Sequence, residues 1–341
     1  MLPTSPPSTP HLRLATYVLA ALALWLVLHL HLLPALLAGL LVHALVNAFA
    51  PGLQRLVPGA RAHAHWLIVA LLAAAVVAVL TMAVIGVVAF LNTEHGNPGL
   101  LFDKLTPLVE RARGQLPQVI VDYLPDNSAE IRAAGMDWLR MHATQLQVVG
   151  KNAARTLVHL LIGMVLGAIV ALHGALPRAS SGPLPVSLAE RCALLLNAFH
   201  DIVFAQLKIS AINTLFTGIF LLVVLPLFGI QLPLAKTLVI VTFVAGLLPV
   251  VGNLISNTLI FVVGLSVSLW VAVAALGFLI VIHKLEYFLN ARIVGSQIRA
   301  RAWELLIAML VMEALFGMAG LVAAPIYYAY LKRELEAAGL I

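Results

Sequence analysis

The chain has 341 residues, of which 62% are hydrophobic and only 10% are charged. Soluble domains carry about 25% charged residues, so this composition excludes a soluble globular protein and predicts one that is embedded in lipid. The formal net charge is +6, but no dense run of Lys or Arg is present. The excess positive charge is therefore better explained by loops that face the cytoplasm than by a nucleic-acid-binding surface. Cys192 is the only cysteine, which excludes an intrachain disulfide.

The apolar segments predict an all-α, polytopic integral membrane protein. They are continuous, whereas barrel strands alternate apolar and polar residues, and a bilayer admits only structures that satisfy their own backbone hydrogen bonds. Because about 20 apolar residues span a bilayer, the chain is expected to hold about six to eight membrane helices. Two of these elements are candidate re-entrant hairpins, and a helical extramembrane insertion completes the predicted fold.

The N-terminal part predicts a tail, three spans and a polar insertion. Residues 1–12 are rich in Pro, Ser and Thr and are expected to form a disordered tail. Residues 13–91 contain two short spans, separated near His31–Pro34, and a third span from Trp66. Residues 92–155 carry seven basic and seven acidic side chains, which indicates a water-exposed helical insertion with a helix that starts near Ser128.

The segment 156–208 predicts a fourth span, a cytoplasmic loop and an amphipathic helix. Gly163 and Gly167 stand four residues apart in the span, and small residues at this spacing let another helix approach closely. The amphipathic helix is expected over 187–208, followed by an uncharged span over 209–235.

The C-terminal segment 209–341 predicts a transport core with broken helices. From Thr237 to Ile282 the chain runs 46 residues without Asp, Glu, Lys or Arg. The stretch 237–266 is too long for one upright helix and too short for two full spans, so we expect a hairpin that turns at Pro249 and Gly252. A second hairpin over 303–331 would turn near Gly317 and Gly320 or at Pro325, although one long tilted helix fits this stretch almost as well.

The distribution of basic residues favours the two hairpins. With the N-terminus in the cytoplasm, a full crossing by 237–266 would place Arg292, Arg299 and Arg301 outside, against the positive-inside tendency. Two hairpins keep these arginines inside, with Arg292 as a cytoplasmic anchor in a loop from 292 to 301. The short tail from Lys332 then lies inside as well. We therefore predict a multi-pass protein in contact with the lipid bilayer, with both termini in the cytoplasm.

Polar residues at membrane depth mark the candidate binding positions, because transporters build mid-membrane sites at helix breaks. Glu313 is the only formal charge between Leu305 and Leu331, and such a carboxylate is either a proton or cation group or a structural partner of another polar side chain. No phosphate loop, metal cluster or nucleophile constellation is present, so we predict neither an enzyme nor a bound cofactor or metal. The candidate substrate- or ion-binding residues are Glu313, Glu286, Asn253, Asn257, Ser256 and Asn213.

Three C-terminal motifs carry a family resemblance. They are Leu247-Leu-Pro249-Val-Val-Gly252, Glu286 followed by Arg292-Ile-Val-Gly295, and Ala314-Leu-Phe-Gly317-Met-Ala-Gly320-Leu-Val-Ala-Ala-Pro325. Together with the order of spans, these motifs resemble the autoinducer-2 exporter family of predicted permeases. Ala291 stands where this family usually has proline, so the chain is similar to a divergent member.

The resemblance implies a homo-oligomeric secondary transporter of a bacterial inner membrane. Its substrate would be a small polar signal or ions in Na⁺/H⁺-type exchange, moved by alternating access. The residues by themselves leave two alternatives: a non-transporting membrane scaffold or sensor that docks partners on 92–155, and a channel.

Overall fold

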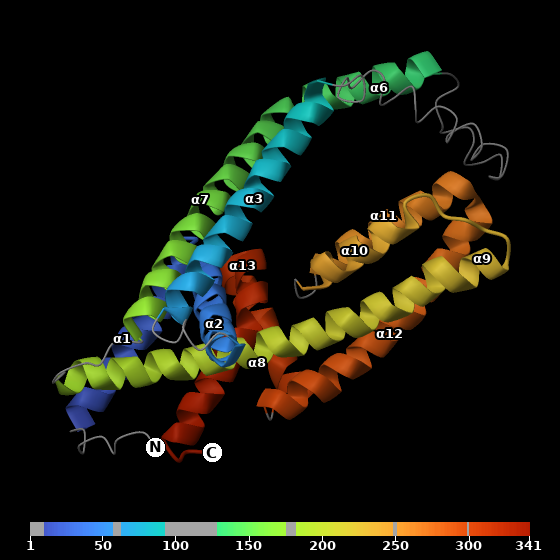
Figure 1. Cartoon of the computed structure of the whole chain (residues 1–341). Helices are drawn as coiled ribbons and strands as arrows, with labels where there is room; N and C mark the ends of the chain where they lie inside the picture. Colours follow the sequence, from blue (N-terminus) through green and yellow to red (C-terminus); the bar gives the residue numbers. More distant parts are fainter. Residues whose placement is uncertain (1–9, 57–62, 93–127, 175–181, 248–250, 299) are drawn as a thin grey trace. The chain divides into compact units, whose positions relative to one another are not determined.

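The computed structural model describes residues 10–56, 63–92, 128–174, 182–247, 251–298 and 300–341. All regular secondary structure in these residues is helical (Figure 1), as expected for an all-α fold. The chain divides into two compact units. Unit 1 comprises residues 1–73, 155–206 and 289–341, and unit 2 comprises residues 74–154 and 207–288.

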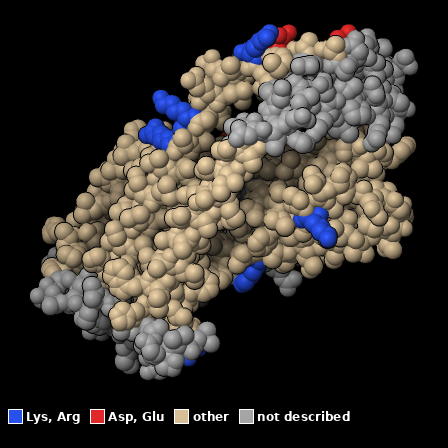
Figure 2. All heavy atoms as spheres, turned by 45° about the horizontal axis from the view of Figure 1, so that its top comes forward, with Lys and Arg blue, Asp and Glu red and all other residues tan. Residues whose placement is uncertain are grey.

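Six stretches of the described chain are long and apolar enough to cross a membrane, which supports the predicted polytopic membrane protein. Charged side chains are sparse on the molecular face in Figure 2. The helices are α1 (Pro10–His29), α2 (Leu33–Leu56), α3 (Ala64–Asn92), α6 (Ser128–Met141), α7 (Ala143–Gly174), α8 (Pro183–Ile219), η3 (Phe220–Val224), α9 (Leu225–Leu227), α10 (Ala235–Gly246), α11 (Val251–Val267), α12 (Leu269–Ile298) and α13 (Ala302–Ala337).

The N-terminal elements follow the predicted order. α1 ends at His29 and α2 begins at Leu33, with His31 at a positive φ of 58° in the turn, which confirms the predicted break. Of the tail predicted to be disordered, residues 1–9 lie outside the described chain. The last three residues of that tail are helical instead, because α1 begins at Pro10, and proline is favourable in the first turn of a helix.

α2 and α7 cross at glycine, as the Gly163 and Gly167 spacing predicts. A Cβ built on Gly39 would stand 3.0 Å from the carbonyl oxygen of Gly163, and one on Gly167 would overlap the backbone of Gly39. α3 runs beside α7 in Figure 1, and a core that includes Val46, Ile68 and Ala171 joins α2, α3 and α7 in unit 1. The glycines therefore let the backbones of α2 and α7 approach closely, and α3 joins them through side chains.

The polar insertion is described only in its second half. Residues 93–127 lie outside the described chain, and α6 begins at Ser128, where the helix start was predicted. His142 separates α6 from α7, yet its N–H donates to the carbonyl of Trp138 at 3.0 Å and its carbonyl accepts from Leu146 at 2.9 Å. The backbone hydrogen bonding thus continues from the insertion into the predicted fourth span.

Two helices run further than predicted. The amphipathic helix over 187–208 and the start of the next span form one helix, α8, which the sequence permits because no Gly or Pro occurs between Pro185 and Gly218. α12 continues to Ile298, so Arg292 lies in a helix and not in the predicted loop. The side chain of Arg292 is outside the described residues, so its role as an anchor stays a prediction.

Candidate functional site

The first predicted hairpin is present in unit 2. α10 ends at Gly246 and α11 begins at Val251, and the two helices pack against each other (Figure 1). Gly252 is buried at their closest approach, where an added Cβ would overlap the carbonyl oxygen of Ala245. The predicted break is therefore confirmed, with Gly252 required by the close approach of the two backbones. Pro249 lies outside the described residues.

One face of α8 presents polar side chains to this hairpin. Ser210, Asn213, Thr214 and Thr217 follow the i, i+3, i+4, i+7 spacing that places residues on one helix face. The Ser210 hydroxyl donates to the carbonyl of Phe243 in α10 at 2.7 Å. Sequence reasoning missed Ser210, although its position three residues before Asn213 was a usable signal.

Asn213 reaches from α8 to α11. Its side-chain Nδ2 donates to Oδ1 of Asn253 at 3.3 Å, and its side chain is 8% exposed. Ser256, 2% exposed, donates to the carbonyl of Asn253 at 3.4 Å. Three of the predicted site residues therefore lie together, and Asn257 is half-buried one turn further along α11. We call Asn213, Thr214, Asn253 and Ser256 the asparagine cluster.

The asparagine cluster contains buried oxygens without a partner. Oδ1 of Asn213 and Oγ1 of Thr214 are buried and accept no hydrogen bond from the described residues. Most buried polar atoms in proteins are paired, so each such atom calls for an explanation, of which an absent water, ion or solute is one. Leaving an acceptor unpaired costs about 1–3 kcal/mol.

The cluster is built from neutral groups beside two helix ends. α10 ends and α11 begins next to it, and such ends carry backbone carbonyl and N–H groups without helical partners together with partial charges. Amides, hydroxyls and carbonyl groups of this kind can hydrogen-bond a polar solute or coordinate a cation through neutral oxygens. Among the described residues, no three His, Cys, Asp or Glu side chains gather as a metal site.

The second predicted hairpin is present in unit 1, within α13. Gly317 has φ 60° and ψ −145°, which interrupts the helix. The hydroxyl of Tyr328 donates to Oε2 of Glu304 at 2.6 Å, although 24 residues separate them. A straight helix would hold these residues about 36 Å apart, at about 1.5 Å per residue. The chain therefore folds back, and the alternative of one long tilted helix is wrong.

Gly320 and Pro325 were also predicted for the second turn, but neither residue forms it. Gly320 is buried where an added Cβ would overlap the carbonyl oxygen of Met312, so it allows the two arms of the hairpin to meet. Pro325 lies inside the second arm, where it is buried, and is not the turn. The arms are residues 302–316 and 318–337.

Of the two predicted carboxylates, the structure describes the side chain of Glu313 alone. Glu313 lies on the first arm of α13 and is exposed in unit 1, so no structural partner in the described chain covers it there. The fold-back at Gly317 sets which face of this arm is covered. Glu286 lies in α12, and its side chain is outside the described residues.

Sequence reasoning missed a set of ion pairs at the end of α13. Helix α13 continues to Ala337, so Lys332, Arg333 and Glu334 are not a tail. The sequence feature that could have indicated these ion pairs is the run of three consecutive charges directly after a long apolar stretch. The partners are Glu304 for Lys332 at 3.6 Å, Asp201 for Arg333 and Arg191 for Glu334. We call these three pairs the α13 clamp, because they tie the second arm to the first arm and to α8.

No family model, no curated protein and no solved structure matches this chain. The family resemblance of the C-terminal motifs therefore stays a prediction, and the functional argument rests on the residues and their geometry.

Proposed function

We propose that this protein is a secondary transporter that binds a small polar solute or an ion at the asparagine cluster. The observation that carries the proposal is the buried, unpartnered Oδ1 of Asn213 beside the break between α10 and α11. A permanent structural role would favour full pairing of such atoms. A site that binds and releases its ligand needs polar groups that the protein itself leaves free.

The lengths of the hairpin arms support membrane re-entry. α10 has 12 residues and α11 has 17, which correspond to about 18 and 26 Å at about 1.5 Å per residue. Both are shorter than the hydrocarbon core of about 30 Å. Irregular backbone at that depth persists only where it is buried in protein or lines a wet cavity. Broken helices around a polar site are how many transporters hold their substrates.

We further propose that the protein belongs with the autoinducer-2 exporters that its C-terminal motifs resemble. The substrate is then a small polar signal or ions in Na⁺/H⁺-type exchange across a bacterial inner membrane, and the hairpins are the moving parts. The exposed carboxylate of Glu313 supports a homo-oligomer. Among Leu310, Leu315 and other exposed apolar side chains, it would be costly in lipid, and a second copy of the chain would shield it.

The proposal is tested by transport after reconstitution into liposomes. Wild-type protein is screened for efflux of small polar solutes and for Na⁺/H⁺ exchange. Asn213→Leu and Asn253→Leu, which keep the side-chain size, should each lower the flux about tenfold or more, because about 1–3 kcal/mol of ligand binding is lost. Thr258→Val is the matched control, since Thr258 lies on α11 with its side chain exposed.

The outcomes separate the alternatives. Normal flux in both asparagine variants would show that the asparagine cluster is not the transport site. Conductance far above carrier turnover would identify a channel. Wild-type vesicles without any flux would favour the scaffold or sensor.

A further inference from the structure

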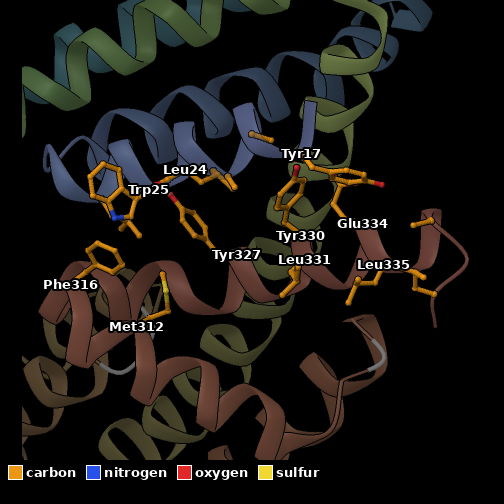
Figure 3. Close-up of a pocket in the computed structure, with 15 residues that line it drawn as sticks. Tyr17, Leu24, Trp25, Met312, Phe316, Tyr327, Tyr330, Leu331, Glu334 and Leu335 are labelled. Carbon is orange, nitrogen blue, oxygen red and sulfur yellow. Dashed lines mark hydrogen bonds between the residues drawn. The ribbon is translucent and has the colours of Figure 1, made fainter. Parts of the chain in front are cut away.

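A long apolar groove runs between α1 and α13 in unit 1 (Figure 3). Its volume is about 570 Å³, which lies in the range of small-molecule sites. On α1 it extends from Tyr17 to Leu28, a length of about 16 Å at about 1.5 Å per residue. A groove of that length and volume is narrow, so it suits a chain-like ligand better than a compact one.

One end of the groove is closed by apolar contacts. Trp25 of α1 and Met312 and Phe316 of the first arm of α13 line this end in Figure 3. The hydroxyl of Tyr327 donates to the carbonyl of Leu24 at 3.2 Å and holds the two helices together there. This end therefore offers apolar surface to the tail of a ligand.

Toward Tyr17 the groove wall includes a few polar side chains among the apolar ones. Tyr17, Tyr330 and Glu334 line this part of the groove in Figure 3. Glu334 is 5% exposed and pairs with Arg191, whose guanidinium carbon lies 4.6 Å from the centre of the Tyr17 ring. Oε1 of Glu334 and Nε of Arg191 are nevertheless buried without a hydrogen bond to the described residues. The groove therefore meets a buried carboxylate oxygen, Oε1 of Glu334, that accepts no hydrogen bond from the described residues.

We propose that the groove binds one phospholipid with a primary ammonium headgroup, that is, phosphatidylethanolamine. One acyl chain lies along the groove from Tyr17 toward Trp25. The ammonium group donates to Oε1 of Glu334, whose side chain lines the groove. Charge-assisted hydrogen bonds of this kind are among the strong ones.

Other lipid heads fit less well. A choline head has no N–H group to donate to the Glu334 carboxylate. An anionic glycerol head brings a phosphate toward that carboxylate without an ammonium group beside it. Lipid is the chosen occupant because α1 is a candidate membrane span and the lining of the groove is apolar, so the groove is expected to meet acyl chains. The exposed Trp25 and Leu331 at its rim are suited to that medium.

Lipid binding is measured by native mass spectrometry of the purified full chain. The protein is titrated in detergent with phosphatidylethanolamine, phosphatidylcholine or phosphatidylglycerol of identical acyl chains. The wild type should bind the first lipid about tenfold more tightly than the other two. Glu334→Gln should abolish this preference, whereas Glu336→Gln, an equal charge change at an exposed position two residues on, should retain it.

A second variant tests the groove without touching the ion pair, since the loss of Glu334 could disturb folding. Ala20→Phe fills the middle of the groove from α1 and should remove binding of all three lipids. Ala23→Phe, at an exposed position of α1 outside the groove, should bind as the wild type does. Equal wild-type affinity for the three lipids, or unchanged binding in Ala20→Phe, overturns the proposal.

Discussion

Gly317 is the residue on which the second hairpin depends. Its φ of 60° with ψ of −145° lies in a region of backbone conformation that side chains other than glycine rarely adopt. Open space surrounds the position where a Cβ would stand, so the requirement for glycine comes from the backbone angles and not from crowding. Gly320, by contrast, is required because the opposite arm approaches its backbone.

Gly317→Ala should destabilise the protein by about 1–3 kcal/mol, the usual cost of a residue held in such a strained conformation. The midpoint of thermal unfolding in detergent measures this loss. Gly277→Ala in α12 is the control, because its added Cβ also meets open space and its φ is not positive. That change should leave stability unchanged or raise it by about 0.4–1 kcal/mol. Equal shifts in the two variants would contradict the prediction.

At the scale of elements, the α13 clamp explains how the second arm is held. Consecutive charges at 332–334 each find an opposite charge, on the first arm or on α8. The Arg191 and Glu334 side chains are 13% and 6% exposed, so removing one of them would leave the other charge buried and unpaired. The side chains of Asp201 and Arg333 are 24% and 30% exposed. Because this pair is less buried, its two charges can be swapped by mutation with less risk of leaving a buried charge unpaired.

Exchange of the two charges tests the clamp. Asp201→Arg and Arg333→Asp alone should each destabilise the protein by about 1 kcal/mol or more, because each places like charges together. The double variant should recover most of the loss, which thermal unfolding of all four proteins measures as a double-mutant cycle. The same exchange at Asp137 and Arg140, with side chains 64% and 76% exposed, should show no measurable coupling. If the stability losses of the two single variants simply add in the double variant, Asp201 and Arg333 do not interact in the folded protein.

At the scale of the whole molecule, the fold-back of α13 constrains the membrane topology. Glu304 near its start contacts Tyr328 and Lys332 near its end, so both ends lie close together and are expected on the same side of a membrane. The first arm, residues 302–316, is about 22 Å long at about 1.5 Å per residue, which is less than the hydrocarbon core of about 30 Å. The turn at Gly317 is thus expected to lie within the membrane.

Cysteine labelling of intact cells tests this topology. In a Cys192→Ala background, single cysteines at the exposed positions Arg301 and Leu340 should be labelled from the same side of the membrane. That side is the cell interior if the basic residues set the orientation. A cysteine at Leu315, next to the turn, should resist an impermeant reagent added on either side. Labelling of 301 and 340 from opposite sides would show that α13 crosses the membrane completely.

The amino-acid sequence by itself determined the membrane class, the all-helical fold and the first helix break, and it left the second break as one of two alternatives. These follow from local properties: the length of apolar runs against bilayer thickness, and the positions of glycine and proline within those runs. Sequence also identified Asn213, Asn253 and Ser256, because polar residues in long apolar tracts stand out without knowledge of their partners.

Only the tertiary structure decided which polar groups meet and which remain exposed. Asn213 meets Asn253 across 40 residues, Arg191 meets Glu334 across 143, and Glu313 remains on the surface of unit 1. The physical reason is that the face a helix turns toward its neighbours depends on packing between positions far apart in the sequence, such as the contact of Gly39 with Gly163. No local pattern of residues encodes that rotation.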